Sequence, residues 1–171
     1  MSEKRHEEML LCGIDPGKEG AIAYVIKCGK RFSLYRLFNM PITKGDYDAQ
    51  ALYTTLLNHK VAATKELELP IKHTLEKVNV HRRSGRKAAF GFGYGYGFIK
   101  GVLGSVPILA DPIRPVEWKK KFNIKKKEDA KKIARKEVTD IDRVIQEDSR
   151  LRSLRIDQAE AILIAIANYK Q

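Results

Sequence analysis

Four acidic residues lie at positions where core packing does not explain them: Asp15, Glu76, Asp157 and Glu160. Asp15 ends an apolar run that starts at Met9, and Glu76 interrupts a strand-like segment. The other two acids open an apolar final helix. A carboxylate near a protein core loses solvation and must be paired or bind a metal. Because no cluster of four bases is available to pair these acids, we predict that all four are catalytic and share a metal site.

The oxygen ligands of this predicted site indicate its chemistry. Carboxylates suit Mg²⁺ or Mn²⁺. Two such ions about 4 Å apart can activate a water and stabilise the leaving oxygen when a phosphodiester is cleaved. Four carboxylates would offset the charge of two divalent ions, so we predict two ions per site. Zinc is disfavoured because no histidine or cysteine cluster accompanies the acids.

Each acid has an ordinary explanation when it is taken alone. Asp15 could be a turn residue, and Glu76 could pair with a neighbouring basic residue. Asp157 and Glu160 are three positions apart, so a helix would place them on one face. However, acidic residues are common in the first turn of any helix. The metal-site hypothesis therefore depends on the whole set and on its order along the chain.

The composition predicts one domain over residues 1–171, with residues 1–8 as a flexible tail. Of the 171 residues, 43% are hydrophobic and 8% aromatic, which suits a folded chain with one core. No apolar run approaches the roughly 20 residues of a membrane helix, and the polar start lacks the apolar part of a secretory signal. The two cysteines form no metal motif and are interpreted as buried thiols in a reducing compartment. We therefore expect a cytoplasmic protein with no membrane partner.

The charge of the chain is strongly basic and unevenly distributed. The formal net charge is +12. Residues 77–100 hold six basic and no acidic residues, and residues 114–136 hold eleven basic and three acidic ones. A charge run alone is typical of a solvated face. Two basic blocks together with an acidic tetrad indicate instead a polyanionic substrate that is brought to a metal site.

The first half of the chain predicts a mixed sheet. Three successive strands with short connections, which indicate an antiparallel meander, are expected at residues 10–14, 21–26 and 32–39. A helix is expected over residues 48–63, with Asp48 as its N-cap. Residues 73–78 form a fourth predicted strand, and the helical crossover before it would make it parallel in the sheet.

The second half is less regular. We expect a short fifth strand at residues 106–109, an irregular link around Pro112 and Pro115, a basic helix at 127–138, a polar loop-like or loosely helical segment at 140–153, and a last helix at 156–169. Residues 90–97 are ambiguous because aromatics alternate with glycines. Each glycine inside a helix costs about 1 kcal/mol, so local rules favour a strand there.

Several segments, in order along the chain, resemble a known family. Residues 12–17 with 20–23, 75–78 and 157–161 are similar to the first hairpin, the second acidic strand and the closing acidic helix of RuvC-type Holliday junction resolvases. The run 90–97 and the segment 116–120 look most like the phage or viral branch of that family. The resemblance extends over residues 10–169.

The resemblance implies an α/β, RNase H-like fold. Its sheet would have five strands, three antiparallel and then parallel ones, flanked by helices. It implies a homodimer that nicks two strands of a four-way DNA junction symmetrically with Mg²⁺ or Mn²⁺. It also implies a helix over residues 85–103 at the dimer interface, and this decides the ambiguous segment. Bacterial members have two aspartates in the final helix, whereas this chain has Glu160 as the second acid, which fits the viral branch. A viral protein would act in the host cytoplasm or at the site of viral DNA replication.

The resemblance also gives the basic residues expected roles in DNA binding. One group would enter the junction centre, lysines of a second group would hold phosphates, and a third would grip a duplex arm through its backbone. These candidates are His81, Arg82, Arg83, Arg86 and Lys87, then Lys119, Lys120 and Lys121, then Lys125, Lys126, Lys127 and Lys131. His81 could instead assist proton transfer. We expect the aromatics of residues 90–97 and Trp118 to serve packing rather than base stacking.

Other functions remain open at the level of sequence. Other nucleases with this fold cleave the RNA strand of RNA–DNA hybrids or cleave DNA flaps. A non-catalytic relative could bind junctions without metal. Residues 13–17 also resemble the phosphate loop of actin-like kinases. Those proteins need two lobes, however, and this chain supplies one, and an ATPase would leave Asp157 and Glu160 unexplained.

Overall fold

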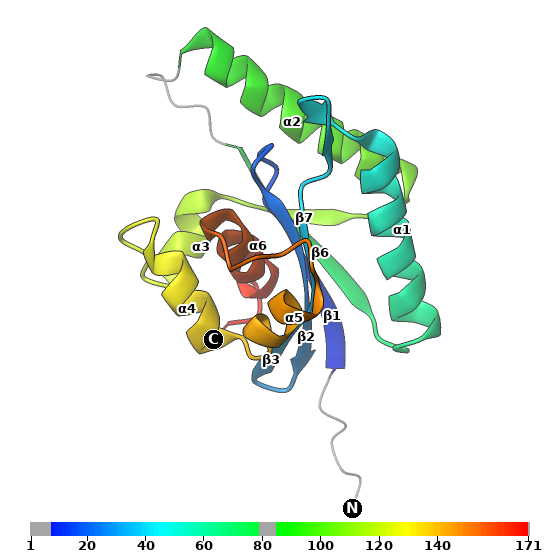
Figure 1. Ribbon diagram of the computed structural model, residues 1–171, viewed down its shortest axis with the longest axis vertical. Coiled ribbons are helices and arrows are strands. Elements are labelled where there is room, and N and C mark those ends of the chain that lie inside the picture. Colours follow the sequence, from blue (N-terminus) through cyan, green and yellow to red (C-terminus); the bar gives the residue numbers. More distant parts are fainter. Residues whose placement is uncertain (1–7, 79–84, 171) are drawn as a thin grey trace, which may run out of the picture.

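The computed structural model describes residues 8–78 and 85–170, which form a mixed sheet between two layers of helices (Figure 1). The sheet has the strand order β3-β2-β1-β6-β7. Its strands are β1 (Glu8–Ile14), β2 (Ala21–Cys28), β3 (Arg31–Asn39), β6 (Ile71–Glu76) and β7 (Ala110–Ile113). The first three pair antiparallel, whereas β6 is parallel to β1 and β7 is parallel to β6. This is the predicted sheet, three antiparallel strands followed by parallel ones.

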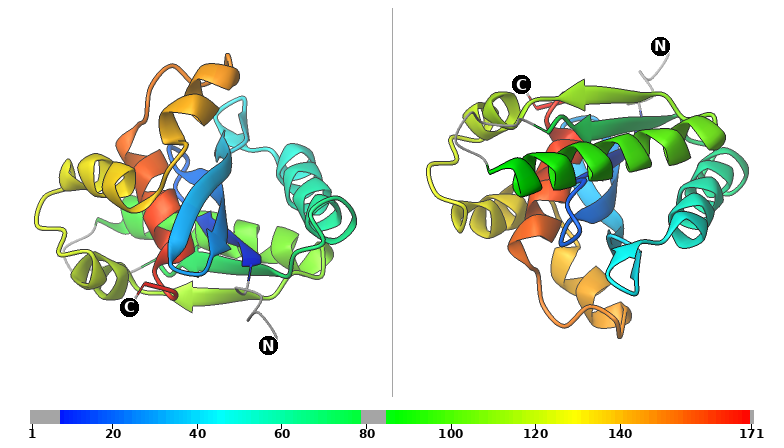
Figure 2. Two further views of the ribbon diagram at one scale, coloured as in Figure 1. Left: turned by 90° about the horizontal axis from the view of Figure 1, so that it is seen from below. Right: turned by 90° about the horizontal axis from the view of Figure 1, so that it is seen from above.

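The helices cover both faces of this sheet (Figure 2). They are α1 (Ala49–Lys65), α2 (Arg86–Ser105), α3 (Pro115–Lys121), α4 (Asp129–Glu137), α5 (Ile141–Glu147) and α6 (Ile156–Ile166). A small hairpin of β4 (Ile42–Thr43) and β5 (Asp46–Tyr47) precedes α1. The helices α1 and α2 lie on one side, and α4, α5 and α6 lie on the other.

The side chains of β1 point alternately to the two faces of the sheet, so this one strand contributes to two cores. Leu10, Cys12 and Ile14 belong to the core beneath α1 and α2, whereas Leu11 belongs to the core beneath α6. Successive side chains of a strand point to opposite faces, so a central strand must be apolar on both. Gly13 faces α6, where a Cβ would collide with the backbone of Ala161. The missing side chain therefore lets α6 pack directly against β1.

Two predicted helices are confirmed in detail. Asp48 is the N-cap of α1, and its Oδ1 accepts a hydrogen bond of 2.9 Å from the backbone N–H of Ala51. The glycine-rich segment is helical as α2, as the resemblance implied and local propensity did not. Tertiary contacts of its buried residues, Gly95, Ile99 and Leu103, offset the weak helix propensity of its glycines.

Three expectations for the second half were wrong or incomplete. The fifth strand is residues 110–113 rather than 106–109, although Val106 and Ile108 are buried below α2. Pro112 lies inside β7, which tolerates it because this is an edge strand. Pro115 occupies the first turn of α3 rather than an irregular link. The polar segment after α4 contains α5, which buries Ile141 and two neighbouring apolar residues.

The first two strands contain the start of the described chain and both cysteines. The predicted tail lies outside the described residues except for Glu8, which begins β1. Cys12 is buried as expected, but Cys28 is exposed at the end of β2, so the expectation of two buried thiols was wrong. Among the described residues, no helix is both long and apolar enough to cross a membrane.

Candidate metal centre

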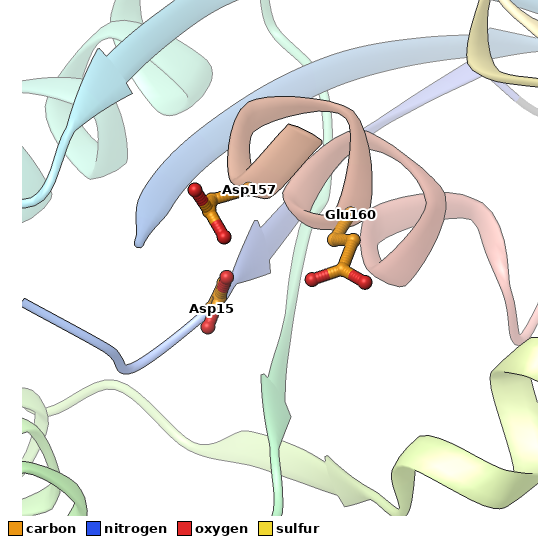
Figure 3. Close-up of side chains that lie close together, drawn as sticks. All are labelled: Asp15, Asp157 and Glu160. Atoms are coloured by element: carbon orange, nitrogen blue, oxygen red, sulfur yellow. The ribbon is translucent and has the colours of Figure 1, made fainter. Parts of the chain in front are cut away.

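Three of the four predicted acids meet at one point of the fold. Asp15 follows the last residue of β1, and Asp157 and Glu160 lie on the first turns of α6. One carboxylate oxygen from each residue lies within 4.8 Å of the others (Figure 3). Asp157 and Glu160 share a face because they are three positions apart on the helix. The predicted convergence of residues distant in sequence is thus present for these three acids.

Local contacts hold the start of α6 against the turn that carries Asp15. The guanidinium of Arg155 donates to the backbone carbonyl of Glu19 over 2.5 Å. The side chain of Gln158 accepts from the backbone N–H of Arg155 and donates to Asn39 of β3 over 2.7 Å. These hydrogen bonds fix the position of α6 along its axis and its rotation about that axis. The carboxylates of α6 are therefore directed toward β1 by contacts that lie outside the acidic cluster.

The cluster is electrostatically strained without a cation. Asp15 is 8% exposed and Glu160 is 7% exposed. Burial raises the pKa of Asp15 to about 7, and the negative charges of Glu76, Glu160 and Asp157 add to this shift. The backbone N–H of Gly17 donates to Asp15 Oδ1 over 3.3 Å and lowers the pKa in part. Like charges in a buried site favour a bound cation or a proton.

Two lysines approach this acidic cluster. Lys127 Nζ lies 3.3 Å from Asp157 Oδ1, and Lys119 Nζ lies 3.4 Å from Glu160 Oε1. Burial lowers the pKa of Lys127, but the hydrogen bond and the charge of Asp157, with the charge of Glu160, outweigh burial and leave it raised. No lysine or arginine among the described residues forms an ion pair with Asp15. The acids are thus only partly compensated by the protein's own cations.

The donor set fits a hard divalent ion. Glu160 Oε1 is buried and accepts no hydrogen bond among the described residues, even with Lys119 nearby. A buried carboxylate oxygen without a hydrogen bond is costly. Asp15, Asp157 and Glu160 offer only oxygen ligands, which suit Mg²⁺ or Mn²⁺ rather than zinc. The buried oxygen without a hydrogen bond and the ligand chemistry together favour a metal position between these residues.

Glu76, the fourth predicted acid, stands beside this group. It lines a cavity of about 370 Å³ together with Asp15 and Lys119. Its Oε1 accepts a hydrogen bond of 2.8 Å from the indole N–H of Trp118, and it is outside the group of three whose oxygens converge. Burial raises the pKa of Glu76, the Trp118 bond lowers it, and the charge of Glu160 raises it further. Glu76 therefore belongs to the cavity, but its carboxylate is held toward Trp118.

Trp118 has a role that its place in the sequence did not reveal. It is completely buried, as expected of a packing residue. Its indole N–H, however, fixes the orientation of Glu76. A buried tryptophan needs a hydrogen-bond acceptor, which is a signal that a partner exists although it does not identify Glu76.

The predicted DNA-binding residues are spread over several elements. Lys119 faces the acids, Lys120 is exposed, and Lys121 donates to the backbone carbonyl of Ala167 at the end of α6 over 2.7 Å. Lys121 thus has a structural partner. Lys121 is nevertheless exposed, as are Arg86 and Lys87 at the start of α2 and Lys125, Lys126 and Lys127 before α4, whereas Lys131 on α4 is half-buried. His81, Arg82 and Arg83 lie outside the described residues.

Three aromatic residues of α2 are exposed, whereas Tyr96 and Phe98 pack against the core. Phe90 is 76% exposed, Phe92 46% and Tyr94 40%. We expected the aromatics of this run to pack in the core or in a dimer; these three residues do not pack in the core, and packing in a dimer remains a prediction. Phe92 also lines the cavity that contains Asp15 and Glu76.

Comparisons with known proteins show what this fold is similar to. No family model matches the chain, and no curated protein matches it. Two solved structures resemble it over nearly their whole length. A Thermus thermophilus RuvC structure has a TM-score of 0.56 at 15% identity, covering 93% of this chain and 92% of that one. The T. thermophilus RuvC in complex with a Holliday junction substrate has a TM-score of 0.55 at 14% identity, covering 93% and 91%. The chain has a RuvC-like, RNase H-like fold.

Proposed function

We propose that this protein is a metal-dependent endonuclease that resolves Holliday junctions or other branched DNA by two symmetric phosphodiester nicks. The observation that carries the proposal is the convergence of Asp15, Asp157 and Glu160 on a RuvC-like fold, with a buried oxygen of Glu160 that accepts no hydrogen bond among the described residues. A protein that only bound DNA would gain nothing from clustered carboxylates beside a phosphate backbone, because like charges repel.

The acids would hold one or two Mg²⁺ or Mn²⁺ ions. When bound, such ions activate a water and neutralise charge on the scissile phosphate. Asp15, Asp157 and Glu160 are the ligands in this proposal, and Glu76 becomes a ligand when its carboxylate turns from Trp118 toward the cavity. Lys119, which lines the same cavity, is placed to contact the phosphate.

The exposed lysines around α3 and α4 would hold the DNA backbone. Lys120, Lys125 and Lys126 are exposed, and Lys127 reaches the edge of the acidic cluster. Phosphate contacts position a duplex without reading its sequence. The similar T. thermophilus RuvC structure contains a Holliday junction substrate, and we extend that class of substrate, branched DNA, to this chain.

The exposed face of α2 would pair with a second copy of the chain. Phe90, Phe92 and Tyr94 are exposed on this helix. Added Cβ atoms at Gly93, Gly97 and Gly101 would meet nothing within 4 Å. The glycines would let the backbone of a second copy approach closely, and the exposed aromatic rings would supply apolar contact area. Two active sites in such a dimer would account for the proposed symmetric nicking. Membership of the phage or viral branch, and action in a host cytoplasm or at a site of viral replication, rest on sequence resemblance.

A cleavage assay tests the proposed function. A four-way junction, a flap, a linear duplex and an RNA–DNA hybrid are incubated with the protein in Mg²⁺, Mn²⁺, Ca²⁺ or EDTA. We expect junction cleavage in Mg²⁺ or Mn²⁺ and none in EDTA. Asp157→Asn and Glu160→Gln should abolish cleavage but retain junction binding in Ca²⁺. Equal cutting of linear duplex, preferred cutting of the hybrid, or cleavage by these variants at the wild-type rate would contradict the proposal.

A further inference from the structure

The small hairpin formed by β4 and β5 lies between the turn that carries Asp15 and the helix α2. Its two strands are only two residues each, and Lys44 and Gly45 connect them with φ of 52° and 79°. Two-residue loops with positive φ at both positions match the twist of a hairpin. The loop is therefore a defined structure that directs Tyr47, the last residue of β5, toward its neighbours.

Tyr47 bonds directly to the turn beside the metal centre. Its hydroxyl donates to the backbone carbonyl of Pro16 over 2.8 Å. Pro16 follows Asp15, and the next backbone N–H, that of Gly17, donates to the Asp15 carboxylate. Lys18 of the same turn donates to the Gly45 carbonyl over 2.5 Å. The hairpin thus holds the peptide units that orient the Asp15 side chain.

The other side of Tyr47 is enclosed by α2. Its ring stacks on Phe98 with ring centroids 5.2 Å apart and lies 5.9 Å from the ring of Tyr94. Tyr94 also donates to Asp46 of the hairpin over 2.9 Å. A Cβ at Gly95 would collide with the Tyr47 hydroxyl, whereas Cβ atoms at Gly91 and other exposed glycines of α2 would meet nothing. Gly95 therefore leaves the space that the hydroxyl occupies.

We infer that Tyr47 is a positioning residue for the metal centre, acting through Pro16 on the Asp15 carboxylate. The inference rests on the proposed function, because it concerns the site that holds the metal. Groups that orient metal ligands from outside typically contribute 10- to 100-fold to metal affinity. The hydroxyl, through this contact, links the position of α2 to the geometry of Asp15. A change in the position of α2 will consequently change how well the site holds its ion.

Two variants test this inference without removing a ligand. Tyr47→Phe keeps the ring between Phe98 and Tyr94 and removes only the hydroxyl, so the variant should fold. Gly95→Ala keeps the hydroxyl but fills its space from another element. Tyr53→Phe on α1 is the matched control, because it removes a hydroxyl that makes no hydrogen bond among the described residues. The full chain is first titrated with Mn²⁺ alone, and electron paramagnetic resonance of the free ion measures binding of the ion. It is then assayed with junction DNA.

We expect both test variants to raise the Mn²⁺ concentration for half-saturation by about 10-fold. Cleavage should return close to the wild-type rate at saturating Mn²⁺, because only ion binding is weakened. Junction binding in Ca²⁺ and the Tyr53→Phe control should be unchanged. A lower melting temperature of Tyr47→Phe with the wild-type Mn²⁺ midpoint would mean a purely structural role and would overturn the inference. If the wild type itself binds no Mn²⁺, the proposed function fails first, and the inference fails with it.

Discussion

Replacing Asp15 by asparagine should stabilise the metal-free protein at neutral and alkaline pH. Asp15 is buried beside Glu76, Glu160 and Asp157, and no cation among the described residues is paired with it. Asparagine has nearly the same shape and can still accept the hydrogen bond from Gly17. The substitution therefore removes a buried charge while leaving the packing in place. Such a gain is expected when a site is shaped for binding rather than for stability.

The magnitude follows from the pKa of Asp15, which burial raises from 3.8 to about 7. A group whose pKa is raised on folding binds more protons in the folded state, so stability falls as pH rises from about 4 to about 7. Each pKa unit corresponds to about 1.4 kcal/mol. The ionised carboxylate thus costs on the order of 4 kcal/mol above pH 7, and this cost is absent near pH 4. The Asp15→Asn variant should be more stable by up to that amount at pH 8 and no more stable at pH 4.

Thermal unfolding in EDTA at several pH values measures this difference. For a chain of this size, about 4 kcal/mol corresponds to a rise in melting temperature on the order of 10 °C. Asp111→Asn on β7 is the control, because it removes an exposed carboxylate and should change stability by less than about 0.5 kcal/mol. With Mn²⁺ at 100 times its Kd, the wild type should gain about 2.7 kcal/mol and the Asp15→Asn variant much less. Equal or lower stability of the variant at pH 8, or a difference that does not depend on pH, would refute the reasoning.

Three further outcomes can be measured. Trp118 is the sole tryptophan, and its indole donates a hydrogen bond to Glu76. Adding Mn²⁺ should therefore change the tryptophan fluorescence of the wild type but not that of the Asp15→Asn variant. An unchanged spectrum in the wild type would contradict the placement of the ion. Gly13→Ala should destabilise the protein by about 1–3 kcal/mol or more, because it forces α6 from β1; urea unfolding measures this, and a neutral effect would contradict the close packing. The affinity for the junction should fall steeply as the salt concentration rises. Replacing three exposed lysines, Lys120, Lys125 and Lys126, by alanine should make the slope of log affinity against log salt shallower by about 0.9 for each phosphate that the variant no longer neutralises. An unchanged slope would show that these lysines lie outside the DNA interface.

The sequence predicted the parts of this fold that local patterns determine. The apolar run that ends at Asp15 indicated a buried strand, and the spacing of Asp157 and Glu160 put both carboxylates on one face. The glycine-rich α2 was predicted from family resemblance, because its own propensity favours a strand. The fifth strand was misplaced because Val106 and Ile108 are apolar for another reason, which is that they fill the core below α2.

The contacts that complete the site could not be read from sequence. Trp118 and Glu76 are 42 residues apart, and Tyr47 and Pro16 are 31 apart. Neither pair has a periodic signal, because each depends on how α3 or the β4–β5 hairpin is placed in three dimensions. For the same reason, the hydrogen bond from Lys121 to the Ala167 carbonyl could not be predicted from the sequence.

Under the proposed function, the two lysines at the acidic cluster would also affect how the site takes up metal ions. Lys119 and Lys127 sit on a helix and on a loop, outside the strands and the helix that supply the acids. Before any ion arrives, they act as resident counterions for Glu160 and Asp157. Metal loading would then be an exchange, in which an incoming ion takes the place of the two ammonium groups at the carboxylates. Each lysine displaced by an ion would become available to a polyanionic substrate, so metal occupancy and substrate binding would be coupled.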